Sequence, residues 1–314
     1  MAFKRPCPKV SIWPHYFGQT VPMSKKNPRR AMSETLSDLL RVKPGSAVDL
    51  SSYDTTATPG FPGKGKADGP ALTQAQGPLI SELQERLYAE GKGDPENARS
   101  VLVVLQGMDT SGKGGTVRHV FGMVDPQGIA LKAFKAPNEE ERKHPYLWRI
   151  TNALPGKGMI GIFDRSQYED VLIVRVESLV PEDVWSQRYD EINAWEADVA
   201  ASGTTILKCF LHISADEQKE RLAARLSDPA KYWKYNPGDV DARAKWPAYQ
   251  EAYAAVLERC STDVAPWHVI PADRKWYRNW AVATLLHEHL AALDPQWPAA
   301  TYDVAAEQAR VAAS

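Results

Sequence analysis

The residues best suited to chemistry lie in one glycine-rich segment. Gly107, Gly112 and Lys113 follow the spacing G-x4-G-K, and two more glycines stand at Gly114 and Gly115. Glycine lets the backbone curl so that successive N–H groups converge on one anion, and a lysine adds a full positive charge. The spacing fits the first part of a phosphate-binding loop, but Gly114 stands where serine or threonine would ligate a metal. The segment therefore predicts a phosphate site whose metal contacts come from other residues.

The sequence around this segment has the strand, loop and helix order that a phosphate loop requires. Residues 101–105 form a short apolar run rich in β-branched side chains, as expected of a strand buried on both faces. From Thr116 onward the apolar residues fall at helical spacing. The start of this helix would add unpaired N–H groups and the positive end of its dipole. We therefore expect Thr116, and Arg118 on the same helix, to lie near bound phosphate.

Two aspartates are candidate magnesium contacts. Asp164 ends a predicted strand at 158–163 and is followed at once by Arg165. Ligands of open α/β sheets bind beyond the carboxyl ends of strands, where such an aspartate commonly holds Mg²⁺ directly or through water. Asp109 lies inside the phosphate loop, where a carboxylate would repel phosphate unless a cation stands between them. It is interpreted as a second magnesium contact or as a base that orients the acceptor. The alternatives are a helix cap for Asp164 and a turn residue for Asp109.

A basic passage at 219–243 predicts a lid. It reads as two helices joined by a proline-containing turn, inserted between the fourth and fifth strands. Basic residues on such a flap can close over a transferring phosphoryl group, neutralise developing charge and exclude water. The alternative is a solvated charged hairpin. The basic residues of this passage include Arg221, Arg225, Lys231, Lys234 and Arg243.

Strands that alternate with helices predict an α/β protein with a parallel five-stranded sheet flanked by helices. The predicted strands are 101–105, 129–133, 158–163, 204–213 and 269–270. Predicted helices begin at 116 and span 33–42, 79–90, 138–150, 184–201, 216–226 and 275–293. The expected organisation is a basic flexible leader (1–33), N-terminal helices and a loop packed on the core (34–98), the core (99–295) with its lid at about 216–260, and a C-terminal tail (296–314).

The composition excludes few functions but limits the partners. The 314 residues carry a net charge of -1, which gives no global reason to expect nucleic acid or a membrane surface. Three scattered cysteines, no apolar run of membrane-spanning length and no signal-peptide pattern favour a cytoplasmic protein.

The leader at 1–33 contains basic residues and no acidic residue. It could be an over-extended start or an arm that holds a polyanion. The passage 273–278 could contact a polyanion, but capping and packing explain it equally well.

Four segments together resemble the polyphosphate kinase 2 family, over roughly residues 36–293. They are Gly-Met-Asp-Thr-Ser-Gly-Lys-Gly-Gly-Thr, Phe-Asp-Arg-Ser-Gln-Tyr-Glu-Asp-Val, Asp-Pro-Ala-Lys-Tyr-Trp-Lys and Ala-Pro-Trp-His-Val-Ile-Pro-Ala-Asp-Arg-Lys. The resemblance implies a thymidylate-kinase-like P-loop core with a helical lid. It also implies reversible, Mg²⁺-dependent phosphoryl transfer between inorganic polyphosphate and purine nucleotides.

Carried over residue by residue, the resemblance gives the candidate site. Asp109 and Asp164 would place metal and phosphates, Lys113 and Arg165 would bind the transferring group, and Arg225 would reach in from the lid. The sequence Ser-Gln-Tyr-Glu-Asp-Val at 166–171 resembles members that phosphorylate AMP as well as ADP.

A polyanionic donor also needs a path lined by basic residues. The candidates are Arg118, Lys132, Lys135, Arg142, Lys143 and, on the lid, Lys234. These residues could equally be ordinary surface charges. A homo-oligomer, dimer or tetramer, is expected. Two other functions fit the residues: an ATP-dependent nucleoside monophosphate kinase of similar fold, and a nucleotide-binding switch without catalysis.

Overall fold

The computed structural model describes residues 34–314, and the predicted leader at 1–33 lies outside the described residues. Its centre is a five-stranded sheet in the order β2-β3-β1-β4-β5, in which every pair of neighbours is parallel. The strands are β1 (Ser100–Gln106), β2 (Ile129–Ala133), β3 (Ile160–Asp164), β4 (Thr204–His212) and β5 (Trp267–Pro271). The predicted fold class, with its parallel sheet and flanking helices, is confirmed.

β1 occupies the middle of the sheet because all of its residues can be buried. Each of its 7 residues is buried, and it pairs with β3 on one side and β4 on the other. β2 is an edge strand, and it leaves Lys132 and half of the Leu131 side chain exposed. The strands that end in the glycine loop and in Asp164 are therefore direct neighbours.

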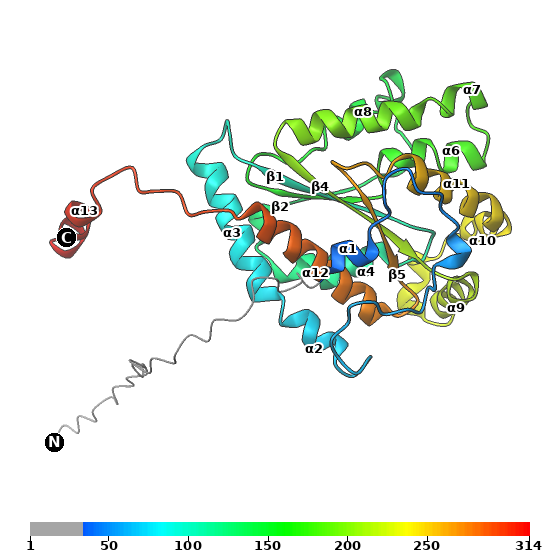
Figure 1. The fold of residues 1–314 in the computed structure, drawn as a ribbon, viewed down its shortest axis with the longest axis horizontal. Coiled ribbons are helices and arrows are strands. Elements are labelled where there is room, and N and C mark those ends of the chain that lie inside the picture. The colour runs from blue at the N-terminus through cyan, green and yellow to red at the C-terminus, as the bar shows by residue number, and fades with distance from the viewer. Residues whose placement is uncertain (1–33) are drawn as a thin grey trace, which may run out of the picture. The chain divides into compact units, whose positions relative to one another are not determined.

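Helices cover both faces of the sheet, as a parallel sheet requires (Figure 1). α8 (Arg188–Ala201) packs on β4 from one side, and α12 (Lys275–Leu293) packs on β4 and β5 from the other, next to α4 (Lys113–His119). The N-terminal helices α1 (Leu36–Leu40), α2 (Gly69–Gln74) and α3 (Gly77–Gly93) pack against α12. None of the described helices is long and apolar enough to cross a membrane.

Two helix predictions were wrong in detail. The predicted helix at 138–150 is only the 3-10 helix η4 (Glu141–Lys143) and α5 (Trp148–Thr151). The start signal is present, because the Asn138 and Glu141 side chains each bind the other residue's backbone N–H, but Pro145 then interrupts the helix. The predicted helix at 184–201 is split into α7 (Glu182–Trp185) and α8.

Part of the predicted C-terminal tail forms a helix, α13 (Val304–Ala312), which Asp303 caps.

The N-terminal helix is tied to the core by partly buried polar contacts. The carboxylate of Glu288 accepts hydrogen bonds from the backbone N–H groups of Leu36 and Ser37, both at 2.9 Å. Nε2 of His268 lies 2.9 Å from the Ser37 hydroxyl. Burial, aided by the neighbouring His289, lowers the pKa of the fully buried His268 to about 3. His268 therefore stays neutral in the native state over a wide pH range.

Acid is expected to destabilise the native state through His268. The unfolded chain binds a proton below the ordinary value of 6.5, whereas the native His268 does so only near pH 3. Its contribution is fully present above pH 6.5 and is lost as the pH falls, at up to about 1.4 kcal/mol per pH unit. In urea unfolding between pH 7 and pH 5, the wild type should therefore lose about 2 kcal/mol more than the variant His268→Gln.

The half-buried His287 on the same helix as Glu288 supplies the control. His287→Gln should keep the wild-type pH dependence. Equal losses in the wild type and in His268→Gln would show that His268 does not cause the effect.

Candidate active site

The glycine loop joins β1 to α4 through two positions that only glycine can occupy. Gly107 has φ +149° and Gly112 has φ +108°. A Cβ atom on Gly107 would lie 2.6 Å from the carbonyl oxygen of Leu211, and one on Gly112 would lie 1.7 Å from a guanidinium nitrogen of Arg278. The predicted glycines are therefore required by backbone conformation and by close packing beneath the loop. Gly114 and Gly115 fall in the first turn of α4.

Lys113 begins α4 and is buried against its own loop. Its ammonium donates to the carbonyl oxygen of Gly107 at 2.8 Å. Burial lowers the pKa of Lys113 most, and the charge of Arg165 adds to that effect. The carboxylates of Asp109, Asp164 and Glu169 act in the opposite direction on the same ammonium. Both predicted aspartates therefore lie within electrostatic reach of the loop lysine.

Arg165 is held in a strained backbone conformation that directs it to the loop. Its φ is +66°, a left-handed value that non-glycine residues seldom adopt. Its Nη2 donates to Oδ1 of Asp109 at 2.7 Å, and its Nη1 lies 3.9 Å from a carboxylate oxygen of Glu169. Burial lowers the pKa of Arg165, but the charges of Glu169 and Asp109 outweigh it and raise the pKa above its ordinary value. Arg165 is thus a permanent cation shared by two carboxylates.

Asp164 lies where the sheet edge meets the loop. It is the last residue of β3, in register with Leu105 of β1 and Ala133 of β2. Its carboxylate favours the charged forms of both cations: it opposes the decrease in the pKa of Lys113 and adds to the increase in the pKa of Arg165. The sequence predicted this position correctly because a carboxyl-terminal residue of a strand next to β1 must meet the phosphate loop.

The residues present fit a hydrated magnesium ion held together with phosphates. Mg²⁺ usually binds one or two carboxylates, several waters and substrate oxygens, and not a full protein cage. Within residues 34–314, no group of three His, Cys, Asp or Glu side chains is arranged for a metal. The carboxylates of Asp109 and Asp164 are oxygen groups of the kind that Mg²⁺ prefers. Buried hydroxyls with no partner in the described chain stand nearby, on Thr110 and Ser111 of the loop and on Thr116 of α4.

Two buried arginines beneath the loop were not assigned to it from the sequence. Arg221 of α9 (Ala215–Leu226) donates to the carbonyl oxygens of Thr110 and Ser111 at 2.8 and 3.0 Å. Arg278 of α12 donates to the Ser111 carbonyl at 3.2 Å and has no carboxylate partner among the described residues. Burial, and then the charge of Arg221, lowers the pKa of Arg278 to about 9. These arginines bind the carbonyl groups of the loop and therefore do not compete for its N–H groups, of which that of Ser111 donates to the Met108 carbonyl.

The lid contains the predicted pair of helices joined by a proline-containing segment, and that segment includes a 3-10 helix. It consists of α9, the 3-10 helix η6 (Pro229–Lys234), α10 (Gly238–Ala244) and the start of α11 (Trp246–Arg259). Arg225 donates to Oδ2 of Asp239 at 3.1 Å and to the carbonyl oxygen of Lys234, so it is engaged within the lid. Burial raises the pKa of Asp239, and the charge of Asp109 in the loop adds to that increase.

The remaining predicted binding residues are on the surface. Arg118 on α4, Lys135 after β2 and Lys234 on the lid are exposed. Their side chains form no hydrogen bond or ion pair with the loop within the part of the chain described. Arg118 lines a surface depression together with His119 of α4 and Ser81 of α3.

A cleft between the loop and the lid contains residues that sequence reasoning missed. Asp109 and Arg165 line it on the sheet side, and Tyr249 and Tyr253 of α11 line it on the lid side. The i, i+4 spacing of the two tyrosines indicated one helix face, but nothing in the sequence indicated that this face meets the loop. Glu169 also lines this cleft, and it accepts from Nε2 of Gln106 at 3.1 Å.

The fold and this site define a kinase of the P-loop class. A glycine loop follows the central strand, an aspartate ends the adjacent strand, and a basic helical lid follows the next strand along the sheet. The family described as polyphosphate kinase 2 (PPK2) matches residues 66–298, and the chain belongs to that family.

Close relatives agree with this assignment. The AMP/ADP-polyphosphate phosphotransferase of Meiothermus ruber is 48% identical over 258 residues, covering 82% of this chain and 94% of that protein. The ADP-polyphosphate phosphotransferase of Rhodopseudomonas palustris is 37% identical, covering 83% and 92%. The crystal structure of polyphosphate kinase 2 from Arthrobacter aurescens TC1 has a TM-score of 0.85 and 51% identity, covering 90% of this chain and 98% of that one.

Proposed function

We propose that this protein transfers phosphoryl groups from inorganic polyphosphate to AMP and ADP, giving ADP and ATP, in a reversible reaction that depends on Mg²⁺. The observation that carries the proposal is the cluster of Lys113, Arg165, Asp109 and Asp164 at the carboxyl edge of β1 and β3. The high similarity to a relative named for AMP and ADP supports both acceptors.

The transfer needs positioning and positive charge more than covalent chemistry. An oxygen of the acceptor's terminal phosphate bonds to the last phosphorus of polyphosphate, and the bond from that phosphorus to the next phosphate breaks. The shortened polyphosphate leaves with the electron pair. Negative charge spread over the transferring group is met by loop N–H groups, by Lys113 and by Arg165. Lys113 would exchange its bond to the Gly107 carbonyl for one to the phosphate.

Asp109 and Asp164 are the residues that would hold Mg²⁺. When bound, the ion would supply positive charge that offsets the negative charge of the phosphates. Arg165 already neutralises Asp109 through the 2.7 Å contact, so the loop carboxylate need not repel a phosphate before metal binds. The role of Asp109 as a ligand or as an acceptor-orienting base stays a prediction.

The lid and the surface basic residues would guide the donor. Arg225 and Lys234 lie on the lid, and Arg118 and Lys135 lie on the core beside the loop and after β2. Because Arg221 ties α9 to the loop carbonyls, closure of the lid and the position of the loop are mechanically linked. The buried free thiols of Cys209 and Cys260 are compatible with a reducing compartment, which supports a cytoplasmic location. A homo-oligomeric state is also part of the proposal.

Separate assays of acceptors and donors test this function. With polyphosphate and Mg²⁺ and no other nucleotide, ADP should yield ATP and AMP should yield ADP, measured by ion-exchange chromatography. GMP and GDP in parallel tubes measure the base preference. ATP plus AMP without polyphosphate tests the alternative of an ATP-dependent monophosphate kinase. If products form only when ATP is the donor, the proposed function is wrong.

A further inference from the structure

A second side chain of the lid helix α9, besides Arg221, holds the main chain of the phosphate loop. Nε2 of Gln218 donates to the carbonyl oxygen of Asp109 at 3.1 Å, and Arg221, one turn further along α9, holds the next two carbonyl groups. Gln218 is only 1% exposed, so bulk water does not replace this partner. Asp109 is thus held at both ends, at its carbonyl by Gln218 and at its carboxylate by Arg165.

The same amide also contacts the second lid helix, α10. Oε1 of Gln218 accepts from Nη1 of Arg243 at 3.3 Å, and that nitrogen also donates to the carbonyl oxygen of Ala215 at the start of α9. The two contacts fix the orientation of the amide, because a carbonyl oxygen only accepts and a guanidinium only donates. Among residues 34–314, Gln218 is the side chain that forms hydrogen bonds with both the phosphate loop and α10.

α10 forms part of the cleft in which the proposed transfer takes place. Ala242, next to Arg243 in the sequence, lines that cleft together with Asp109 and Arg165. A shift of α10 therefore moves one wall of the cleft. Gln218 links this wall to the main chain of Asp109, which lines the same cleft.

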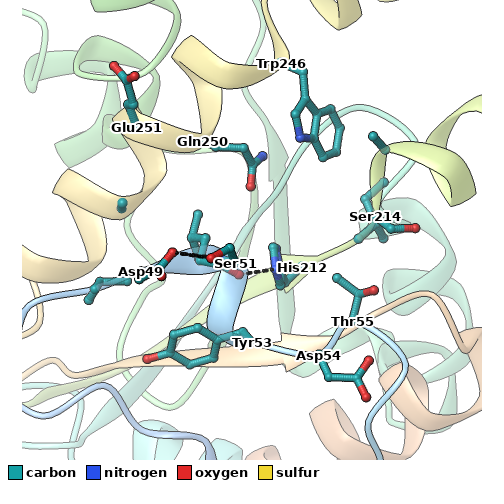
Figure 2. A pocket seen from close by; sticks show the side chains of 15 residues that line it. Asp49, Ser51, Tyr53, Asp54, Thr55, His212, Ser214, Trp246, Gln250 and Glu251 are labelled. Carbon is teal, nitrogen blue, oxygen red and sulfur yellow. Dashed lines mark hydrogen bonds between the residues drawn. The ribbon is translucent and has the colours of Figure 1, made fainter.

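The two ends of the lid are not closely packed against each other. A pocket of about 560 Å³, next to His212 of β4, is bordered by Ser214 and Ala215 at one end of the lid and by Trp246 at the other (Figure 2). Close packing would fix the relative position of these ends without polar contacts. With an open space there, the hydrogen bonds of Arg243 provide a larger share of the constraint between α9 and α10.

We propose that Gln218 is a positioning residue for phosphoryl transfer, which couples the lid helix α10 to the main chain of Asp109. The inference rests on the proposed function, because that function places Asp109 and Arg165 in the transfer site. Gln218 acts through Asp109 and not through contact with the substrate. Loss of either hydrogen bond of its amide should release the loop from α10.

Hydrogen–deuterium exchange of the full chain tests this coupling without turnover. Arg243→Met changes α10 at a side chain that forms no hydrogen bond with the loop among residues 34–314. The backbone amides of the peptide 107–113 should nevertheless exchange at least about threefold faster than in the wild type. Gln218→Met should give the same increase, and the double variant should add nothing further. Glu220→Met, at an exposed position of α9, should leave the exchange of this peptide unchanged.

Arg243→Lys supplies the conservative variant. One nitrogen, Nη1, makes both contacts of Arg243, so one ammonium group can replace it. Arg243→Lys should therefore restore most of the protection that Arg243→Met loses, and this pair decides the question even if Gln218→Met does not fold. Unchanged exchange in Arg243→Met, equal exchange in Arg243→Met and Arg243→Lys, or effects that add in the double variant would overturn the proposal.

Turnover supplies the second readout. Gln218→Met and Arg243→Met should each lower kcat about tenfold, because a small displacement of a catalytic group costs rate, and the KM for ADP should stay within about twofold of wild type. The double variant should lose no more than either single variant. Wild-type kcat in both single variants, or a loss of about a hundredfold in the double variant, would contradict the positioning role. A wild type without polyphosphate-dependent turnover would contradict the proposed function instead, and the exchange experiment would still decide the coupling.

Discussion

Lys113→Ala is expected to lower kcat for ATP formation from polyphosphate and ADP by about 10³-fold or more. The ammonium lies at the centre of the site, within electrostatic reach of Asp109, Asp164 and Arg165. Loss of one preorganised donor to a transition-state oxygen commonly costs about 10²–10³ in rate, and Lys113 carries a full charge in addition. ATP release measured by luciferase, at saturating polyphosphate and ADP, gives the ratio directly.

Lys92→Ala is the matched control, because Lys92 is an exposed lysine on α3 remote in sequence from the loop. It should retain the wild-type rate, and thermal unfolding should show that both variants are folded. A Lys113→Ala rate within a few fold of wild type would contradict the assigned role. Weaker nucleotide binding without loss of rate would instead favour the nucleotide-binding switch.

Glu196→Gln is expected to lower the free energy of unfolding by about 3–5 kcal/mol, because removing one partner of a buried ion pair leaves the other charge uncompensated. Oε2 of Glu196 accepts from Nζ of Lys208 at 2.6 Å, and both side chains are completely buried. The hydroxyl of Tyr168 donates to Oε1 of Glu196 at 2.7 Å. Urea unfolding measures the loss.

A double variant separates the ion pair from simple packing. Glu196→Gln with Lys208→Met removes both charges and should recover most of the lost stability. Asp198→Asn, on an exposed position of the same helix, should change it little. A Glu196→Gln protein within about 1 kcal/mol of wild type would contradict the expectation from buried ion pairs.

The same network extends to the candidate site. Tyr168 and Gln167 both donate to Glu196 and belong to η5 (Gln167–Asp170), which begins two residues after Arg165. We therefore expect Glu196→Gln to lower kcat even at temperatures where it is folded. Its two effects, on stability and on rate, have one structural cause.

Local patterns predicted the parts of the site that local backbone controls. A buried apolar run followed by glycines at fixed spacing determines the strand and loop, and Asp164 follows from the end of a neighbouring strand. The helix predicted at 138–150 was wrong. Most residues of this segment favour a helix, but the one proline, Pro145, interrupts it. Local patterns also missed Arg278, because the partners of a buried arginine on a long helix depend on how that helix crosses the loop.

Contacts between segments distant in the sequence could not be predicted from local patterns, because they depend on how the elements pack in three dimensions. The i, i+4 pair Tyr249 and Tyr253 indicates a helix face but not its neighbour. The pocket at His212 needs residues 48–55, which the sequence presents only as a loop. Which surface such a loop covers is determined by tertiary packing, here by the contact of Thr55 with Asp273.

The most direct test follows one phosphate from donor to acceptor. In a single turnover with polyphosphate carrying ³²P at its terminal residue, ADP and Mg²⁺, the label should appear in the γ-phosphate of ATP. The protein should carry no label, and Lys113→Ala should transfer almost none in the same time. Label found only in orthophosphate or on the protein, or transfer that requires added ATP, would contradict direct transfer from polyphosphate at this site.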